Sequence, residues 1–219
     1  MKVVAVVPMK LNNQRLPQKN TKAFTNGEPL CRYILHTLLS VAGIDEVYVY
    51  CSSPSIKEFI PIGVKFLKRS KTLDSDTTTM NDVLRSFAED VSSDIYVMAH
   101  ATAPFVTRHS IEMGLRAVKD GEYDSSFTAS KIQDFLWRDG RPFNYNLSEI
   151  PRTQDLPPLY KETSGFYIYK QSVIKNMSRR IGNKPYIVEI GEIEGMDIDE
   201  AEDFMIADAI YTCIKGKQR

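Results

Sequence analysis

Residues 3–22 read V-V-A-V-V-P-M-K-L-N-N-Q-R-L-P-Q-K-N-T-K, a short apolar run that leads directly into a cationic loop. A continuous run of small and β-branched residues over 3–7 is typical of a buried strand. Lys or Arg occupies five of the first 27 positions and no acid precedes Glu28, although the whole chain has 28 basic and 28 acidic residues. The positive charge is therefore local, and a cationic loop after a buried strand is suited to holding phosphates.

The rest of the chain alternates short apolar segments with helical patterns. Alternation of this kind predicts an α/β fold with a mostly parallel central sheet flanked by helices. We expect strands over residues 3–7, 46–51, 64–67, 94–99, 125–129, 165–169 and 186–190. We expect helices over 29–41, 55–60, 77–90 and 107–119, each opened by Pro, Ser or Thr, and a last helix over 200–214. Its apolar stripe would consist of Phe204, Ala207, Ala209, Ile210 and Ile214.

The alternation weakens in the segment over residues 131–160. Turn signals such as Asp139-Gly140 and Pro157-Pro158 replace helical periodicity there. We interpret this segment as an inserted β-rich arm. An insertion of this size either covers a site or pairs with a second subunit, and the sequence alone favours neither.

Size and composition restrict the class of protein. A chain of 219 residues can bury a substantial core, and we interpret residues 1–219 as a single domain that includes the arm. Cys31, Cys51 and Cys213 are widely spaced, so we expect small core residues and reduced thiols. The apolar start is too short for a signal peptide or a membrane span, which predicts a cytoplasmic protein with no membrane partner. Zero net charge also argues against nucleic acid as the partner.

The first loop is the first candidate site. It matches neither G-x-x-x-x-G-K-[ST] nor G-x-G-x-x-G, so its side chains rather than a glycine cradle would bind phosphate. A solvated basic loop is the alternative. Its place after the first strand favours the phosphate site, because ligands of open α/β sheets bind beyond the carboxyl ends of strands, here after Val7, Cys51 and Ala99.

The second candidate site is the acid-rich stretch near the other end. Nine acids and no basic residue lie from Glu189 to Asp208. In extended chain, Asp197 and Asp199 point the same way while Ile198 points into the core. Such a pair suits Mg²⁺, which takes oxygen ligands and shares them with substrate phosphates. The alternative is that the two acids cap the last helix. A cationic loop and an acid pair together are what a nucleoside triphosphate with Mg²⁺ requires.

A third stretch runs from Arg152 to Tyr167. Arg152 is able to pair with a substrate carboxylate through two hydrogen bonds, and the alternative is a surface ion pair. Gly165 allows a backbone to approach a ligand closely.

At this point the order of motifs resembles the acylneuraminate cytidylyltransferase family. The matching pieces are R-L-P-Q-K-N at 15–20, R-S-K-T-L-D-S-D-T-T-T at 69–79, T-A-P at 102–104, R-T-Q-D-L-P at 152–157 and D-I-D at 197–199. The resemblance covers nearly the whole chain in the right order. It implies a Rossmann-like nucleotide-diphospho-sugar transferase fold and transfer of CMP from CTP to a 2-keto-3-deoxy sugar acid.

The resemblance also implies roles for individual residues. The catalytic residues would be Lys10, Arg15, Lys19 and Asp199. Nucleotide binding would fall to Pro8, Lys10, Asn20, Arg69, Ser75 and Asp76. Substrate binding would fall to His100, Thr102, Arg152, Gln154 and Tyr167. Asp197 and Asp199 would be the magnesium ligands.

The chain departs from the family pattern mainly on the acceptor side. His100 stands where the family has glutamine, and Glu162-Thr163-Ser164-Gly165 replaces its E-N-G. In the first loop, Asn13-Gln14 replaces a common Ser-Lys. The resemblance further implies a homodimer in which one arm reaches the other subunit's acceptor site. Two alternatives remain open: activation of a non-sugar acidic acceptor such as a phosphonate, and a module that binds CTP or a CMP-sugar without turnover.

Overall fold

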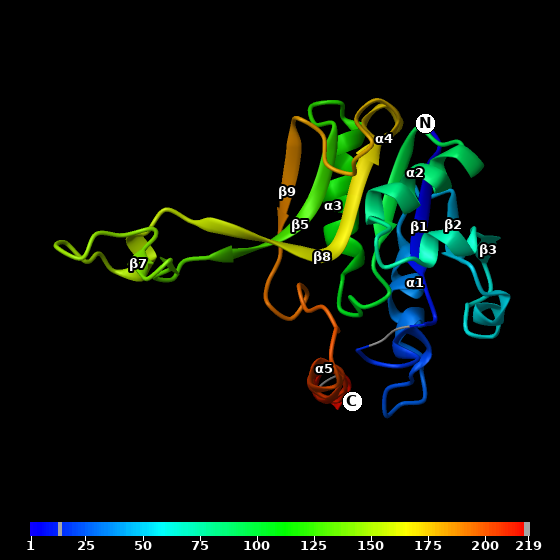
Figure 1. Cartoon of the computed structure of the whole chain (residues 1–219), viewed down its shortest axis with the longest axis horizontal. Helices are drawn as coiled ribbons and strands as arrows, with labels where there is room; N and C mark the ends of the chain where they lie inside the picture. Colours follow the sequence, from blue (N-terminus) through cyan, green and yellow to red (C-terminus); the bar gives the residue numbers. More distant parts are fainter. Residues whose placement is uncertain (13–14, 217–219) are drawn as a thin grey trace.

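One seven-stranded sheet organises the chain, and a computed structural model describes residues 1–12 and 15–216. The strands of this sheet are β1 (Val3–Met9), β2 (Glu46–Cys51), β3 (Val64–Lys68), β4 (Ile95–Ala99), β5 (Ser125–Ile132), β8 (Leu159–Lys170) and β9 (Pro185–Glu189). Their order is β3-β2-β1-β4-β8-β5-β9, and β8 alone is antiparallel to its neighbours (Figure 1). The predicted α/β fold with a mostly parallel sheet is confirmed.

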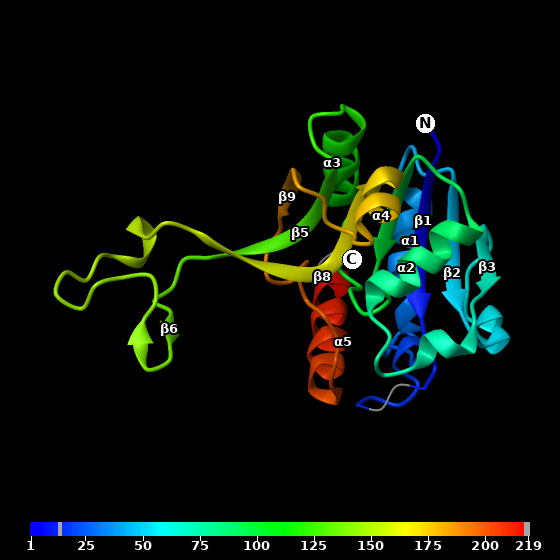
Figure 2. The same cartoon turned by 45° about the horizontal axis from the view of Figure 1, so that its top comes forward.

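Helices cover both faces of the sheet. The α-helices of the described chain are α1 (Leu30–Ser40), α2 (Met80–Asp90), α3 (Arg108–Lys119), α4 (Gln171–Met177) and α5 (Ala201–Gly216). Helices α1 and α3 pack on one face, and α2 and α4 on the other (Figure 2). Short 3-10 helices occupy four connections: η1 (Lys19–Thr21), η2 (Pro54–Glu58), η3 (Lys71–Asp74) and η4 (Thr153–Asp155).

Threonine caps set where two of the helices begin. Thr79 accepts a hydrogen bond from the backbone N–H of Asp82, and the Asp82 carboxylate accepts from the backbone N–H of Thr79. Such a capping box satisfies two N–H groups that a helix start leaves without partners. Thr107 caps α3 through its hydroxyl alone, which accepts from the backbone N–H of Ser110. Helix α3 therefore begins directly after Thr107, whereas α2 begins at Met80, three residues later than predicted.

Helix α5 is attached to the first loop rather than to the sheet. Phe204 and Ala207 are buried against Leu16, Phe24 and Leu30 in a separate small core. The Asp208 carboxylate also accepts hydrogen bonds from the N–H and hydroxyl of Thr25, at 2.9 and 2.5 Å. These contacts hold the cationic first loop against the acid-rich segment that contains α5.

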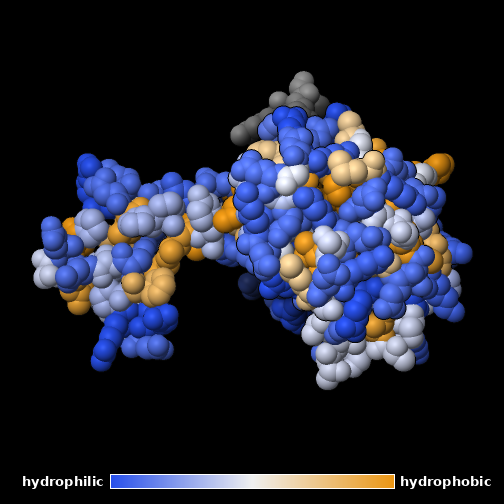
Figure 3. All heavy atoms as spheres, turned by 90° about the horizontal axis from the view of Figure 1, so that it is seen from above, coloured by the Kyte–Doolittle hydropathy of each residue, from blue (hydrophilic) through white to orange (hydrophobic). Residues whose placement is uncertain are grey.

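The arm is a long extension of the β5–β8 pair. Lys131 and Ile132 pair with Tyr160 and Leu159, so the base of the arm continues the main sheet. It projects from the body of the molecule and contains the small β6–β7 hairpin, β6 (Trp137–Arg138) and β7 (Arg141–Pro142) (Figures 1 and 3). Its exposed apolar residues include Phe135, Trp137, Phe143, Leu147 and Ile150.

Several local predictions were wrong. Where we predicted a helix over residues 55–60, the chain forms only the 3-10 helix η2, which starts at Pro54 and ends at Glu58. Helix α4 lies in a region where we predicted none. On α5, Ala209 and Ile214 are exposed although Phe204 and Ala207 are buried, because only one side of the helix meets the small core.

Cys31 and Cys51 are buried as predicted, whereas Cys213 is exposed on α5. No helix in the described part of the chain is long and apolar enough to cross a membrane.

Candidate active site

The carboxyl ends of β1, β2 and β4 lie at one edge of the sheet, because the three strands are parallel. The cationic loop, the segment after β2 and the segment after β4 all start there. The acid-rich segment 196–200 reaches the same edge, where the backbone N–H of Ile198 donates to the Thr102 carbonyl at 3.0 Å. Ile198 itself is fully buried, as predicted, and anchors the two aspartates beside it.

The cationic loop and the acid pair are in direct contact. Lys19 Nζ and an Arg15 Nη2 each lie 3.0 Å from Oδ1 of Asp199, and Arg15 also reaches Glu200 at 3.4 Å. Lys19 is held firmly, since it is only 8% exposed. Burial raises the pKa of Asp199, but Lys19 and Arg15 outweigh burial and hold this pKa below its ordinary value. Asp199 is therefore a carboxylate at neutral pH.

Asp197 provides an oxygen that is free to take a ligand. Its Oδ1 is buried and has no hydrogen-bond partner among the described residues. A buried carboxylate oxygen left unpaired is costly unless a ligand satisfies it. Capping of α5 is performed by Asp203, whose carboxylate accepts from the backbone N–H groups of Asp199 and Glu200. Asp203 therefore does what the alternative interpretation assigned to the two predicted metal ligands, and capping is not their main role.

The donor set of this pair fits magnesium. Within residues 1–12 and 15–216 no group of three or more His, Cys, Asp or Glu side chains is placed to hold a metal ion. Two carboxylates are nevertheless sufficient for Mg²⁺, which keeps several waters and takes its other ligands from substrate phosphates. The orphaned oxygen of Asp197 and the ionised Asp199 supply oxygen ligands of this kind.

The predicted nucleotide-binding residues surround a small cavity of 160 Å³. Pro8, Lys10, Arg69 and Ser75 are among its lining residues. Arg69 is almost completely buried, and its Nη2 lies 2.7 Å from Oδ1 of Asp74, while its Nε is buried without a partner among the described residues. A buried N–H donor at the wall of a cavity is suited to an acceptor atom of a ligand.

Two more of the predicted nucleotide residues support this region from outside. Lys10 Nζ lies 3.4 Å from the Asp76 carboxylate. Asn20 donates from Nδ2 to the carbonyl of Lys10 at 3.1 Å and so fixes the start of the loop. The predicted departure at Asn13-Gln14 lies outside the described residues.

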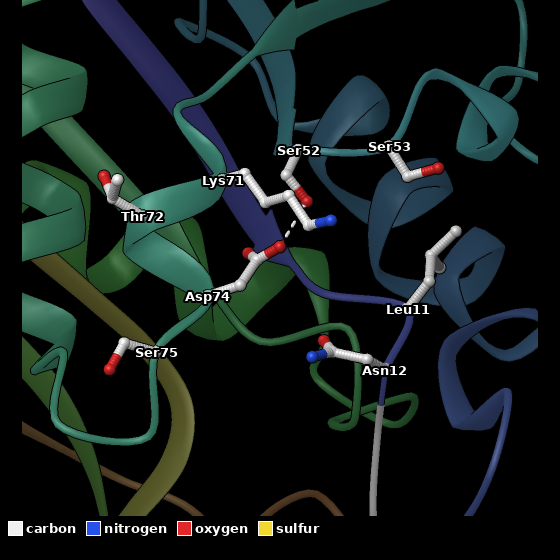
Figure 4. A pocket seen from close by; sticks show the side chains of 8 residues that line it. All are labelled: Leu11, Asn12, Ser52, Ser53, Lys71, Thr72, Asp74 and Ser75. Atoms are coloured by element: carbon white, nitrogen blue, oxygen red, sulfur yellow. Dashed lines mark hydrogen bonds between the residues drawn. The ribbon is translucent and has the colours of Figure 1, made fainter.

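A larger cavity of 580 Å³ adjoins the first and shares Ser75 with it. Figure 4 shows Leu11 and Asn12 of the first loop facing Asp74 and Ser75 across the opening, with Ser52 and Lys71 between them. The Ser52 hydroxyl donates to Asp74 at 2.5 Å. We did not predict Ser52, Lys71 or Asp74, although the rule that ligands bind beyond strand ends does indicate the segment after Cys51.

The predicted acceptor residues His100 and Tyr167 lie close together. Their rings are 6.4 Å apart, and Tyr167 donates from its hydroxyl to Glu162 at 2.5 Å. Burial lowers the pKa of His100 to about 4, although Asp197 opposes the shift. His100 is therefore a neutral hydrogen-bonding group at pH 7. Burial likewise raises the pKa of Tyr167 to about 12 and keeps its hydroxyl protonated.

A third cavity, of 470 Å³, lies on this acceptor side. Its lining includes Glu162, Thr163, Ser164 and Asp197, so it adjoins the predicted metal ligands. We did not predict a role for Glu162 itself or for Arg180, which contacts both Glu162 and Tyr167. No motif marks Arg180, which follows a short helix far along the chain.

Two predicted acceptor residues lie away from these cavities. Arg152 and Gln154 are on the arm, which projects from the body (Figure 1). Arg152 is exposed and makes a two-point ion pair with Asp155, at 2.7 and 3.0 Å, while the carbonyl of Gln154 accepts from Gln133. Within one chain, the structure does not bring them to the site.

Several proteins of known activity are similar to this chain in sequence. The CMP-N,N'-diacetyllegionaminic acid synthase of Legionella pneumophila is 26% identical over 96% of both chains. N-acylneuraminate cytidylyltransferase B of Danio rerio is 23% identical over 93% of this chain, and 3-deoxy-manno-octulosonate cytidylyltransferase 2 of Hydrogenovibrio crunogenus is 25% identical over 77%. This chain matches 50% and 64% of the length of those two relatives.

Solved structures show the same fold. A structure of CMP:2-keto-3-deoxy-manno-octonic acid synthetase complexed with CTP superposes with a TM-score of 0.75 at 20% identity, over 97% of this chain and 99% of that one. The family described as Cytidylyltransferase matches residues 4–204. With a match over this span, and with a cationic loop facing an acid pair at the strand ends, the chain belongs to the cytidylyltransferase family.

Proposed function

We propose that this protein transfers CMP from CTP to an acidic sugar, a sialic-acid-like or other 2-keto-3-deoxy sugar acid, and releases pyrophosphate. The observation that supports this most is the contact of Lys19 and Arg15 with Asp199. In this contact, two cations of the kind that bind phosphate lie 3.0 Å from Asp199, one of the two carboxylates that we propose as metal ligands.

The chemistry requires charge neutralisation and positioning more than a covalent intermediate. A hydroxyl of the acceptor attacks the α-phosphorus of CTP, the bond to the β-phosphate breaks and pyrophosphate leaves. Lys10, Arg15 and Lys19 offset the negative charge that grows on the leaving pyrophosphate. Arg69 would face the base or ribose in the small cavity.

Asp197 and Asp199 would hold Mg²⁺ that arrives with the nucleotide. The ion would neutralise phosphate charge and favour ionisation of the attacking hydroxyl. Before the nucleotide binds, Lys19 and Arg15 balance the charge of Asp199; afterwards the phosphates are available as their partners.

The acceptor class rests on the relatives, whose names specify diacetyllegionaminic acid, N-acylneuraminate and 3-deoxy-manno-octulosonate. The direct test is pyrophosphate release from CTP with a panel of these acids, a phosphonate and a phosphorylated polyol. We expect turnover with a sugar acid. Turnover only with the phosphonate or polyol would support a different acceptor class, and tight CTP binding without any turnover would indicate a binding module.

We also propose that the protein is a homodimer joined by its arms. The arm exposes Phe135, Trp137, Phe143, Leu147 and Ile150 on a segment that packs against little of its own chain (Figure 3). Exposed apolar residues gathered in one place are typical of an interface. Such an interface would carry Arg152 to the partner's acceptor site.

Light scattering tests the dimer. We expect twice the chain mass for the wild type and a shift to monomer for Trp137→Ser. Ile62→Ser is the control, because Ile62 is a fully exposed apolar residue far from the arm. A wild type that is monomeric at high micromolar concentration would contradict the proposal.

A further inference from the structure

Arg180 is a partly buried cation that contacts Glu162, one of the residues lining the acceptor cavity. It lies just beyond α4, after Ser178, which ends that helix in a left-handed conformation. Its guanidinium carbon lies 4.0 Å from the centre of the Tyr167 ring, and its Nη2 lies 3.5 Å from Oε1 of Glu162. The side chain retains 25% exposure, so a ligand can reach it.

The acceptor cavity is lined mainly by acidic side chains, although the acceptor that we propose for it is itself an acid. Its lining contains four carboxylates, Glu162, Glu192, Asp197 and Asp203, and one cation, Lys161. Asp203 is committed to backbone N–H groups at the start of α5, and Asp197 is a proposed metal ligand. A carboxylate that enters this cavity needs an additional positive partner.

The geometry of Arg180 suits that role. The guanidinium lies over the Tyr167 ring, and a contact of this kind leaves its N–H groups able to form the two parallel hydrogen bonds that a carboxylate accepts. The contact with Glu162 uses one amino group at 3.5 Å and is long for a hydrogen bond. Glu162 also has the Tyr167 hydroxyl as a donor at 2.5 Å, so it stays hydrogen-bonded when Arg180 changes partner.

We propose that Arg180 binds the carboxylate of the acceptor, which replaces Glu162 as its partner. The inference rests on the proposed function and makes Arg180 a specificity-determining residue for acidic acceptors. It gives each subunit its own acid-binding cation, whereas Arg152 lies on the arm and is paired with Asp155.

The test compares an acid with its uncharged analogue. The probes are the sugar acid that gives turnover in the acceptor panel and its carboxamide, with kcat and KM measured for each. In Arg180→Gln we expect KM for the acid to rise about 10- to 100-fold, with KM for CTP unchanged. We expect the preference of the enzyme for acid over carboxamide to fall by the same factor. A preference that stays at the wild-type value would overturn the proposal.

Glu162→Gln separates binding from simple positioning. If Arg180 only holds Glu162 in place, both variants break the same pair and raise KM for the acid alike, which would overturn the inference. If Glu162 competes with the acceptor for Arg180, Glu162→Gln lowers KM for the acid instead. Arg179→Gln is the matched control, since Arg179 is a neighbouring exposed arginine that contacts Met177 and Asn183, and we expect wild-type values for it.

Thermal unfolding checks that each variant is folded. If Arg180→Gln does not fold, Arg180→Lys replaces it: the charge remains but the two-point fork is lost, and a reduced preference for the acid is still expected. Unchanged preference in Arg180→Lys would then overturn the inference. If no acid in the panel is turned over by the wild type, the proposed function itself fails, and the inference falls with it.

Discussion

Lys19 Nζ lies 3.0 Å from Asp199 Oδ1, although 180 positions separate the two residues in the chain. The contact joins the loop after the first strand to the segment before the last helix. Thr25 and Asp208 reinforce it through two further hydrogen bonds. The two ends of the chain thereby form one site.

Asp199→Asn should abolish most turnover without unfolding the protein. The change removes a negative charge from the proposed metal site, and the loss of a preorganised charged group at a reaction centre costs on the order of 100-fold in kcat. Helix α5 keeps its place through Phe204 and Asp208. Kinetics at saturating Mg²⁺ check this, with Glu202→Gln on the exposed side of α5 as the control. An undiminished rate would remove Asp199 from the metal site.

Lys19→Ala should chiefly weaken binding of CTP. Lys19 is buried and directed at the site, and a charge-assisted hydrogen bond to phosphate is worth roughly 1.5–3 kcal/mol. We expect KM for CTP to rise about 10-fold or more, with little change in KM for the acceptor. Lys175→Ala, on the exposed surface of α4, should behave as the wild type. A Lys19→Ala enzyme with normal CTP kinetics would count against the phosphate-binding loop.

Arg69→Met should lower stability as well as nucleotide binding. The Arg69–Asp74 pair is buried on both sides, with side chains 4% and 13% exposed. Removal of one partner of a buried ion pair leaves the other charge uncompensated and costs about 3–5 kcal/mol. Denaturant unfolding measures the loss, and the double variant Arg69→Met/Asp74→Asn should recover part of it. A loss below about 1 kcal/mol for Arg69→Met would show that the pair contributes little.

Glu46→Gln tests the electrostatics at the amino end of β2. Hydrogen bonds from Lys65 and Lys2 lower the pKa of Glu46 from 4.5 to about 2. A carboxyl whose folded-state pKa is depressed stabilises the protein above its unfolded pKa and loses that contribution as pH falls through the folded pKa.

The difference in unfolding free energy between wild type and Glu46→Gln should therefore be largest above about pH 4.5 and vanish near pH 2. Its size should be about 0.2–1 kcal/mol, as is usual for ion pairs near the surface. Glu89→Gln on α2 serves as control. A difference that does not change between pH 2 and pH 6 would rule out the proposed pairing.

The sheet was largely predictable from the sequence because buried parallel strands such as residues 3–7 are continuous apolar runs. The antiparallel direction of β8 was not predictable, since an apolar pattern of this kind reads the same for a strand running in either direction. Cys213 was predicted in the core because free cysteine is usually buried, but its position on α5 is exposed. The charge pattern around Lys19 was informative because its loop follows the end of a buried strand, and the pattern around Asp199 because alternate side chains of an extended chain point the same way.

The acceptor side was less predictable. Glu162 and Arg180 come from a strand and from the turn after a short helix, and only the folded chain brings them to Tyr167. Arg152 carries a motif but lies on the arm, so within one chain the motif does not place it at the site. Which residues bind the acceptor therefore depends on tertiary contacts that no local spacing encodes.

The most direct test of the proposed activity follows the α-phosphate of CTP. The enzyme is incubated with Mg²⁺, a sugar acid of the panel and CTP labelled at the α-phosphorus, and the products are separated. We predict that the label appears in a CMP-sugar while unlabelled pyrophosphate is released in equal amount. Label recovered only in free CMP, or remaining wholly in CTP with every acid of the panel, would contradict the proposed transfer.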